Sequence, residues 1–244
     1  MYRFYCPDAD FSKPSVVITD ADEVHHIENV LRLKKGSLIQ ISNAKSQQAE
    51  GIIEQIKAAA IHVHVKKVKQ NEEVRAQITL ACAPPKKGKF ELIIEKCTEL
   101  GVDGIIPLKT KRTEVIFKED RMAGKLSRFE AVAINAAKQS QRTKVPRIYP
   151  MTPLLQVLQT LDPKGIHVFP SLHHHPKHIA DVFLKADAYK PVTIFIGPEG
   201  DFTPDEVELA VRHGCVPVSL GDTVLKVETA AIAAVALVKF LCRN

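Results

Sequence analysis

The sequence predicts an α/β protein built from a small N-terminal β-barrel and a larger domain in which helices cover a parallel sheet. Short strand-like segments dominate up to about residue 72, and beyond the polar stretch Gln70–Glu73 apolar strand candidates alternate with helix candidates. A chain of 244 residues also has room for two modest domains. We therefore expect one domain over residues 1–72 and a second over residues 73–244.

The N-terminal elements are short and rich in β-branched residues. A helical pattern is limited to residues 22–31, and the other segments show the partial alternation of apolar and polar residues that is typical of strands. We expect these strands over residues 15–19, 37–42, 49–56 and 61–68. Four short strands and one short helix indicate a small barrel.

Beyond residue 73 the alternation of strands and helices favours a parallel sheet, because parallel strands need long, usually helical crossovers. The segment Thr203-Pro204-Asp205-Glu206 is a capping box with proline at the first helical position, so a helix should begin there and end at Gly214. We expect strands over residues 76–83, 104–108, 165–169, 192–196 and 216–220, and helices over residues 88–100, 118–142, 152–161, 177–186, 204–213 and 227–241.

The last of these helices, over residues 227–241, is apolar on nearly every face. A surface helix carries an apolar stripe on one face only. We therefore expect this helix to be buried, with a second subunit covering part of it.

Composition excludes several classes of protein. Hydrophobic residues make up 45% of the chain and charged residues 25%, as in an ordinary globular protein. The longest apolar run, Ala230–Val238, is about half of a membrane span, and the start of the chain lacks a signal-peptide pattern, so we expect a cytoplasmic protein without a membrane segment. Five cysteines without a CxxC pair indicate neither a disulfide framework nor a zinc ribbon.

The net charge of +6 is concentrated in the middle of the chain, where residues 76–150 hold 15 basic and 8 acidic residues. Such an excess predicts a surface that faces a polyanion. Solvated helix faces are the alternative explanation of the charge alone.

Two glycine-containing loops predict a ligand site. Residues 193–196 form an apolar strand that runs directly into Gly197-Pro198-Glu199-Gly200, and the loop 220–230 has the same layout of strand, glycine turn and helix. Open α/β sheets place ligands at the carboxyl ends of their strands, and glycines let the backbone approach a ligand closely. The chain has neither GxGxxG after its first α/β strand nor GxxxxGK[ST], so the sequence does not indicate an ordinary dinucleotide or nucleoside triphosphate site. Plain strand-to-helix turns are the alternative.

These loops carry a family resemblance. Residues 196–202 and 220–230 resemble the C-terminal signature of the RsmE-type 16S rRNA (uracil-N3)-methyltransferases of the SPOUT superfamily. The resemblance also covers residues 23–26 with 30–33, residues 95–102 with 106–107, and residues 135–142 followed by Pro146. It spans nearly the whole chain, and five segments in order at compatible spacing make it specific.

The resemblance implies a PUA-like N-terminal barrel that contacts RNA and a C-terminal domain with a deep trefoil knot that binds S-adenosylmethionine. It implies methylation of N3 of a uridine in the 16S rRNA of the small ribosomal subunit, and a homodimer. A non-catalytic RNA-binding or ribosome-assembly factor, and a methyltransferase acting on another RNA, are the alternatives.

The expected site residues fall into three groups. We expect the methyl donor to lie against Phe169, Pro170, Gly197, Pro198, Glu199, Gly200, Leu220, Gly221, Val224, Leu225 and Thr229. The catalytic candidates are Arg142, for the substrate phosphate or the uracil anion, and Glu199 and Glu228, for proton removal or for orienting the loops. We expect RNA contacts from Arg32, Lys34, Lys35, Lys86, Lys87, Lys89, Lys111, Arg112, Arg142, Lys144 and Arg147.

We expect no metal site. The run His173–His178 has residues that suit zinc, nickel or copper, but adjacent histidines in a loop do not easily face one ion.

Three residues depart from the family pattern. Asp201 stands where a second glycine is usual, Lys138 replaces the usual glutamate, and Lys226 replaces an arginine. A lysine lacks the planar fork with which arginine binds an acceptor through two hydrogen bonds. We interpret the chain as a divergent but active member of the family.

Overall fold

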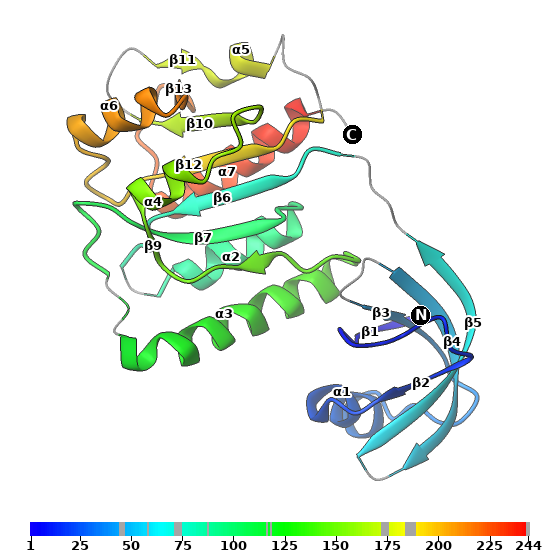
Figure 1. Ribbon diagram of the computed structural model, residues 1–244. Coiled ribbons are helices and arrows are strands. Elements are labelled where there is room, and N and C mark those ends of the chain that lie inside the picture. The colour runs from blue at the N-terminus through cyan, green and yellow to red at the C-terminus, as the bar shows by residue number, and fades with distance from the viewer. Residues whose placement is uncertain are drawn as a thin grey trace. The chain divides into compact units, whose positions relative to one another are not determined.

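The computed structural model describes residues 1–43, 47–57, 59–70, 75–86, 88–115, 117, 119–171, 176–183 and 189–242. The chain divides into two compact units, each of which is described by itself (Figure 1). The first unit is Met1–Glu73 with Ala137–Val145, and the second is Val74–Ala136 with Pro146–Asn244.

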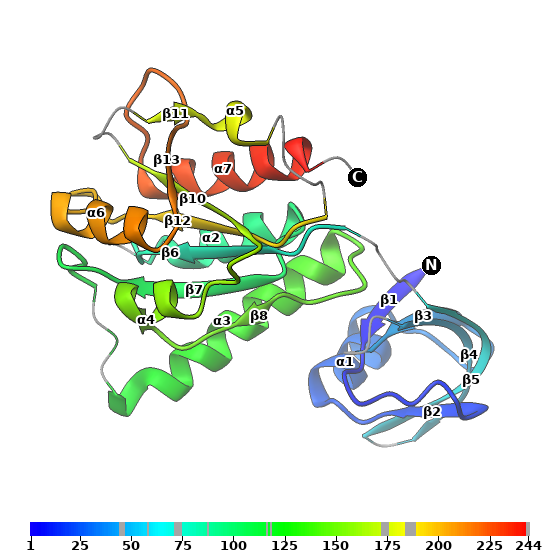
Figure 2. The same cartoon turned by 45° about the horizontal axis from the view of Figure 1, so that its top comes forward.

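The first unit is a curled five-stranded sheet (Figure 2). The strands are β1 (Tyr2–Tyr5), β2 (Ser15–Ile18), β3 (Leu38–Ser42), β4 (Gln47–Lys57) and β5 (Ala60–Gln70), in the order β1-β3-β4-β5-β2. Only the β1–β3 pair is parallel. The sheet encloses an apolar core that includes Phe4, Ile18, Ile27, Ile39, Ile41, Ile53 and Ile61. Strand β1 is not predicted from the sequence, because its residues YRFY include no β-branched side chain.

The predicted helix at residues 22–31 is present as two pieces. Helix α1 (Ala21–His25) begins at Asp20, whose side chain accepts a hydrogen bond from the Glu23 backbone N–H, and a π-helical turn, η1 (His26–Val30), follows directly. Ile27, in this turn, is fully buried and ties the helical segment to the core of the sheet.

The second unit contains an eight-stranded sheet whose pairs are all parallel. The strands are β6 (Ile78–Cys82), β7 (Gly104–Lys109), β8 (Arg147–Ile148), β9 (Thr152–Pro153), β10 (Ile166–Pro170), β11 (Lys177–His178), β12 (Val192–Ile196) and β13 (Val216–Ser219). The helices are α2 (Phe90–Glu99), α3 (Glu119–Gln139), α4 (Leu154–Gln159), α5 (Ile179–Phe183), α6 (Pro204–Arg212) and α7 (Val227–Leu241).

The predicted strands and helices of this unit are all found, with small differences at their ends. The two-residue strands β8, β9 and β11 are additional, because a pattern cannot be read from two residues. The fifth helix is shorter than the predicted 177–186, and residues 184–188 lie outside the described part of the chain. Helix α6 has the predicted capping box and begins with Pro204.

The strand order β11-β13-β10-β12-β6-β7-β8 decides where the site can form. Strand β12 lies between β10 and β6, and β13 pairs with the other side of β10. Because the strands are parallel, the segments that follow β6, β10, β12 and β13 leave the sheet at one edge. The knot implied by the family resemblance stays a prediction, since strand order alone does not define threading.

Helix α7 has the predicted bounds, but the described residues of this chain cover only one of its faces. Val227, Ala231, Ala234, Val235 and Val238 are buried, and contacts run to α2, β6 and β12. On the other side, Leu237 is 37% and Phe240 82% exposed. Burial of the whole helix would therefore need a second chain.

Lys138 forms an ion pair within the first unit. Glu23 is only 2% exposed, and its Oε1 accepts a hydrogen bond from the Tyr5 backbone N–H at 3.1 Å. The same oxygen pairs with Nζ of Lys138, near the end of α3. A buried carboxylate is costly without a cation beside it. The lysine at position 138 is thus matched by an acid in the sheet domain.

We expect Lys138→Met to lower the free energy of unfolding by about 3 kcal/mol, because it leaves the Glu23 carboxylate buried without its cation. The matched control is Lys13→Met, whose partner Asp10 is 4.0 Å away on an exposed surface. That change should cost less than about 1 kcal/mol. Urea denaturation followed by circular dichroism measures both, and equal effects of the two substitutions would contradict the role of Lys138.

Candidate functional site

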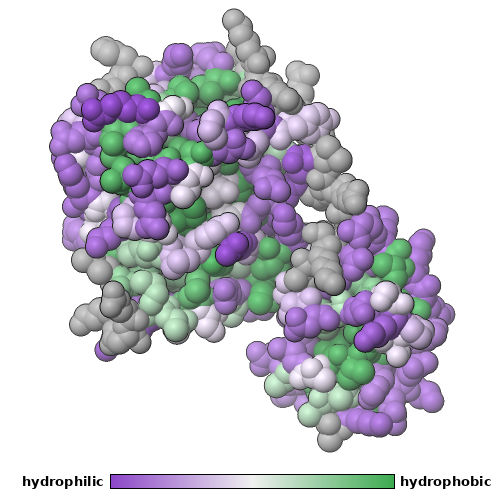
Figure 3. All heavy atoms as spheres, in the orientation of Figure 1, coloured by the Kyte–Doolittle hydropathy of each residue, from purple (hydrophilic) through white to green (hydrophobic). Residues whose placement is uncertain are grey.

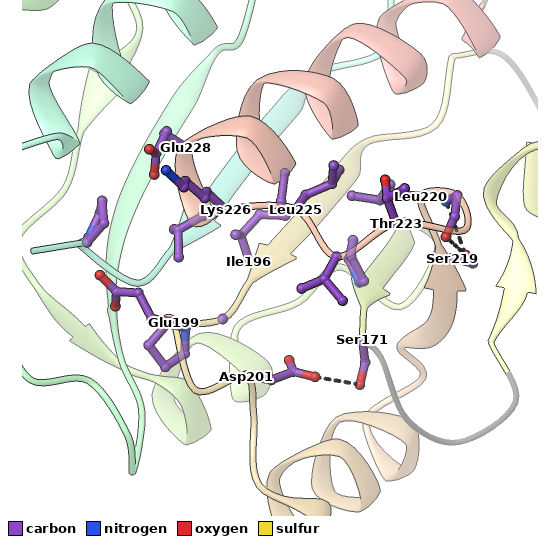
Figure 4. A pocket seen from close by; sticks show the side chains of 18 of the residues that line it. Ser171, Ile196, Glu199, Asp201, Ser219, Leu220, Thr223, Leu225, Lys226 and Glu228 are labelled. Atoms are coloured by element: carbon purple, nitrogen blue, oxygen red, sulfur yellow. Dashed lines mark hydrogen bonds between the residues drawn. The ribbon is translucent and has the colours of Figure 1, made fainter.

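A cavity of about 500 Å³ lies at the carboxyl ends of β6, β10, β12 and β13 (Figure 4). Its volume is within the range of about 300–1,000 Å³ that is usual for small-molecule sites. Four segments contribute to its lining. They are Pro85, Lys86 and Lys89 after β6, Pro170 and Ser171 at the end of β10, the loop after β12, and residues from the end of β13 to the start of α7, without Asp222 and Thr229. The two loops that the sequence singles out therefore do form one cavity.

The first of these loops, residues 197–201, turns sharply at the end of β12. A Cβ atom on Gly197 would lie 3.0 Å from the Phe202 ring, so this position favours glycine. The Asp201 backbone N–H donates to the Pro198 carbonyl at 2.9 Å and closes the turn. Asp201 itself has a left-handed backbone, with φ of 58°. Non-glycine residues seldom adopt this conformation, although Asp and Asn do so more readily than others.

Neighbouring segments hold the loop in place. Glu199 Oε1 accepts from the Lys86 backbone N–H at 2.9 Å, and the Gly200 carbonyl accepts from the Arg112 guanidinium at 2.5 Å. Arg112 and Lys86 come from the segments after β7 and β6, so three strand ends fix the position of one turn.

The capping box at the start of α6 also binds the segment after β7. The carboxylate of Glu206 accepts from the Thr203 backbone N–H and, through its other oxygen, from the Lys111 backbone N–H at 2.7 Å. Glu206 is only 6% exposed, so it is a buried acceptor shared by α6 and the segment after β7.

The second loop, residues 220–226, contributes glycine and apolar groups. Gly221 has φ of 133°, and its backbone N–H and carbonyl both bond to the Ser219 hydroxyl, at 3.1 and 3.0 Å. Val224 lines the cavity and is 77% exposed. An apolar side chain left open in a cavity is available to enclose a ligand.

An ion pair lies at the start of α7. Glu228, in the first turn of the helix, pairs with Nζ of Lys89 from the segment after β6. The hydrogen bond that Lys89 donates lowers the pKa of Glu228 below its ordinary value of 4.5, and a hydrogen bond from the glutamate's own backbone N–H adds to this effect. A carboxylate with a lowered pKa is a weak base at neutral pH. The geometry therefore favours the loop-orienting alternative for Glu228 over proton removal.

Most of the expected donor residues line the cavity: Pro170, Gly197, Pro198, Glu199, Leu220, Gly221, Val224 and Leu225. Three do not. The side chain of Phe169 is fully buried against Phe202 and Phe195, with ring centres 4.0 and 5.4 Å away. Gly200 and Thr229 are exposed outside the lining.

Several residues that line the cavity are not indicated by the sequence, among them Pro85, Ser171 and Ser219. Pro85 and Ser171 each follow a strand of the sheet by only a few residues. Their place in the strand order, which only the structure shows, brings them to the site. The position of a residue just after a predicted strand is the only signal that points to them.

Arg142 belongs to the first unit, where its backbone N–H donates to the Ala137 carbonyl at 2.9 Å just beyond α3. Its catalytic role stays a prediction, as do those of Glu199 and Glu228.

The expected RNA-binding residues are mostly exposed: Arg32, Lys34, Lys35, Lys86, Lys111, Arg112, Lys144 and Arg147. Several contact other groups of this chain. Lys86 Nζ pairs with Glu114 at 2.7 Å, Lys111 Nζ pairs with Asp205 at 2.8 Å, and the Arg147 guanidinium lies 4.8 Å from the Tyr149 ring centre. Exposed pairs of this kind are weak and exchange readily for a phosphate. Lys87 lies outside the described residues.

The five cysteines are buried, and burial raises the pKa of Cys6, Cys97 and Cys215 to about 12. In the described part of the chain, no three His, Cys, Asp or Glu side chains gather as a metal ion would need. His173–His175 of the histidine run lie outside it. None of the helices in the described ranges has the length and apolar composition of a membrane-spanning helix.

Comparison with known families matches both parts of the chain. The family model for an RNA methyltransferase domain matches residues 71–239, and that for an RNA methyltransferase PUA domain matches residues 18–68. These matches confirm the predicted family and the predicted PUA-like and methyltransferase folds.

Similar proteins carry the name ribosomal RNA small subunit methyltransferase E. The one from Mycobacterium tuberculosis is 30% identical over 230 residues, covering 93% of this chain and 87% of that protein. The one from Bacillus subtilis is 29% identical over 233 residues, covering 93% and 90%.

Two solved structures with similar folds contain S-adenosylmethionine. One is the ribosomal RNA small subunit methyltransferase E of Neisseria gonorrhoeae, with a TM-score of 0.87, 26% identity, and coverage of 99% of this chain and 98% of that chain. The other is a Legionella pneumophila protein, with a TM-score of 0.86, 29% identity, and coverage of 98% and 96%.

We expect Glu228 to titrate below pH 4.5 in the folded protein, because Lys89 stabilises its charged form. The pair therefore stabilises the fold above pH 4.5, and this contribution is lost as the pH falls through the lowered pKa. Carboxyl-carbon NMR measures the midpoint directly.

Lys89→Met should return the midpoint toward 4.5, whereas Lys111→Met, which removes the partner of Asp205, should leave it unchanged. A wild-type midpoint at or above 4.5 would show that the pair does not form in solution.

Proposed function

This chain belongs to the RNA methyltransferase family, and on that premise we propose that it transfers a methyl group from S-adenosylmethionine to N3 of a uridine in 16S rRNA. The cavity at the strand ends is the observation that carries the proposal. It joins the two glycine loops of the family signature, and its lining combines apolar side chains with backbone polar groups.

The residues present suit such a donor. Gly197 and Gly221 line the cavity without a side chain of their own, and Leu225 and Val224 supply apolar contact. These residues, with Pro198 and Leu220, would hold the donor, which supplies an electrophilic methyl group when bound. Backbone groups in such loops can bond the edge of an adenine ring.

The main catalytic task of the chain is to position the two reactants. Holding them near attack distance can contribute about 7–11 kcal/mol. The N3 proton of uracil must also leave, and basic groups near the ring would stabilise the resulting anion. Glu199 is exposed at the cavity and oriented by the Lys86 backbone N–H, so we assign proton removal to Glu199 and loop orientation to Glu228. Arg142 is assigned to the substrate phosphate or the uracil anion.

RNA binding is assigned to the basic residues of both units. Arg32, Lys34 and Lys35 are exposed on the unit that contains the PUA match. Lys86 lines the cavity, Arg112 bonds the Gly200 carbonyl, and Lys111 is exposed beside α6. Contacts from such residues go mainly to phosphates, so they fix the position of the RNA and do not read its sequence. The small ribosomal subunit is the proposed source of the RNA, and the cytoplasm the proposed location.

The deciding experiment is nucleoside mass spectrometry of 16S rRNA from a deletion strain. N3-methyluridine should disappear and return when the wild-type gene is restored. Gly197→Val should not restore it, because its Cβ would press on the Phe202 ring. The matched control, Gly124→Val, lies in α3, where a Cβ meets nothing within 4 Å and the backbone is not left-handed, and should restore it.

N3-methyluridine that persists in the deletion strain would refute the assigned reaction. If a methylated nucleoside is instead lost from another RNA, the alternative of a methyltransferase that acts on that RNA is favoured. An unchanged set of nucleosides, with ribosome assembly impaired, would favour a non-catalytic factor.

We also propose a homodimer formed through α7. The support is the exposed apolar side of that helix, where Leu237 and Phe240 face away from the chain's own core. Phe240→Glu should shift the protein from dimer to monomer in sedimentation measurements, because a charge would have to be buried in the interface. The matched control is Val211→Glu, because Val211 is exposed on α6. This change should leave the dimer mass measured by sedimentation unchanged. A monomeric wild-type protein would refute the proposal.

A further inference from the structure

We propose that the carboxylate of Asp201 binds a cationic group of the methyl donor. This inference rests on the proposed function and adds a donor-binding residue to it. Asp201 lines the cavity on the side where β10 and β12 end, beside Ser171 (Figure 4).

The structure fixes the orientation of this carboxylate. Oδ1 accepts a hydrogen bond from the Phe202 backbone N–H at 2.8 Å, and the Ser171 hydroxyl donates to Oδ2 at 3.4 Å. The two donors come from different strand ends, so the side chain is held from two directions. A carboxylate fixed in advance loses little freedom when a ligand binds.

The backbone of Asp201 has a conformation in which a side chain is unusual. Its φ of 58° is a conformation that glycine adopts without strain, and the family resemblance places a second glycine here. Aspartate stands there instead and projects a charge to the wall of the cavity. The family's shared chemistry does not require that charge, so its effect should be specific to this chain.

The charged groups of the cavity are unevenly placed. Lys226 and Glu228 lie together at the start of α7, while Asp201 lies with Ser171 at another part of the wall (Figure 4). Glu228 is paired with Lys89, and Glu199 is bound by the Lys86 backbone N–H. A ligand that fills the cavity therefore meets the Asp201 carboxylate at a place separate from Lys226 and Glu228 (Figure 4).

The donor has two cationic groups, the sulfonium and the α-ammonium of its methionine tail. Methyl transfer breaks the bond between the methyl carbon and sulfur and forms a bond between that carbon and N3. The bonding electron pair stays on sulfur, so the product is a neutral thioether. A carboxylate near the sulfonium attracts the donor and loses that attraction after transfer. A carboxylate near the ammonium attracts both molecules.

The test is calorimetric binding of three probes to the wild type and to Asp201→Asn. Asparagine has the same shape and tolerates a left-handed backbone, so only the charge is lost. The probes are S-adenosylmethionine, with both cations, S-adenosylhomocysteine, with the ammonium alone, and methylthioadenosine, with neither. We expect the affinity for S-adenosylmethionine to fall at least about fivefold, as for loss of a charged hydrogen bond, and that for methylthioadenosine to stay unchanged.

The second probe locates the contact. An unchanged affinity for S-adenosylhomocysteine assigns Asp201 to the sulfonium, and an equal fall assigns it to the ammonium. Asp201→Gly also removes the charge and relieves the backbone, so it should give the same pattern. Asp222→Asn is the matched control, because this carboxylate is exposed in the neighbouring loop outside the cavity lining, and it should change none of the three affinities.

Equal changes for all three probes, or unchanged binding of S-adenosylmethionine to Asp201→Asn, would overturn the inference and leave the proposed function standing. Failure of the wild type to bind S-adenosylmethionine even with RNA present would instead refute the proposed function and this inference with it.

Discussion

The parallel arrangement of the larger sheet is the constraint on which the site depends. Strands β6, β10, β12 and β13 are far apart in the sequence but neighbours in the sheet, and all leave it at one edge. Together the segments that follow these strands contribute glycine turns, apolar side chains, three lysines and three carboxylates. Hydrogen bonds from Lys86 and Arg112 fix the turn after β12. The chemistry of the cavity thus follows from strand order.

The sequence predicts elements well where a local signal exists. The capping box at Thr203 fixes the start of α6, and the unbroken apolar pattern of α7 gives both of its ends. The sequence does not reveal partners across the sheet. Nothing near Ser171 indicates that it bonds Asp201, and nothing near Phe169 separates a core residue from a cavity residue. Glycine loops and strand ends are visible in a sequence, whereas neighbours in a sheet are not.

The departures from the family pattern have physical explanations at two of the three positions. Lys138 has a buried acid, Glu23, as its partner, so a change of charge is balanced inside the first unit. Asp201 accepts hydrogen bonds from Ser171 and Phe202, so an unusual residue in a strained conformation is held by its surroundings. For Lys226 the described residues offer no comparable partner that explains the loss of arginine's second hydrogen bond.

The hydrogen bonds of Glu206 constrain the length of the segment that follows β7. Its two carboxylate oxygens serve the first turn of α6 and the backbone of Lys111, and the guanidinium of the next residue, Arg112, reaches the Gly200 carbonyl. Inserting or deleting a residue just after β7 would displace all of these bonds together and release the turn at Gly200. That connection should therefore keep a constant length among active relatives, whereas loops on the opposite edge of the sheet are free to grow or shrink.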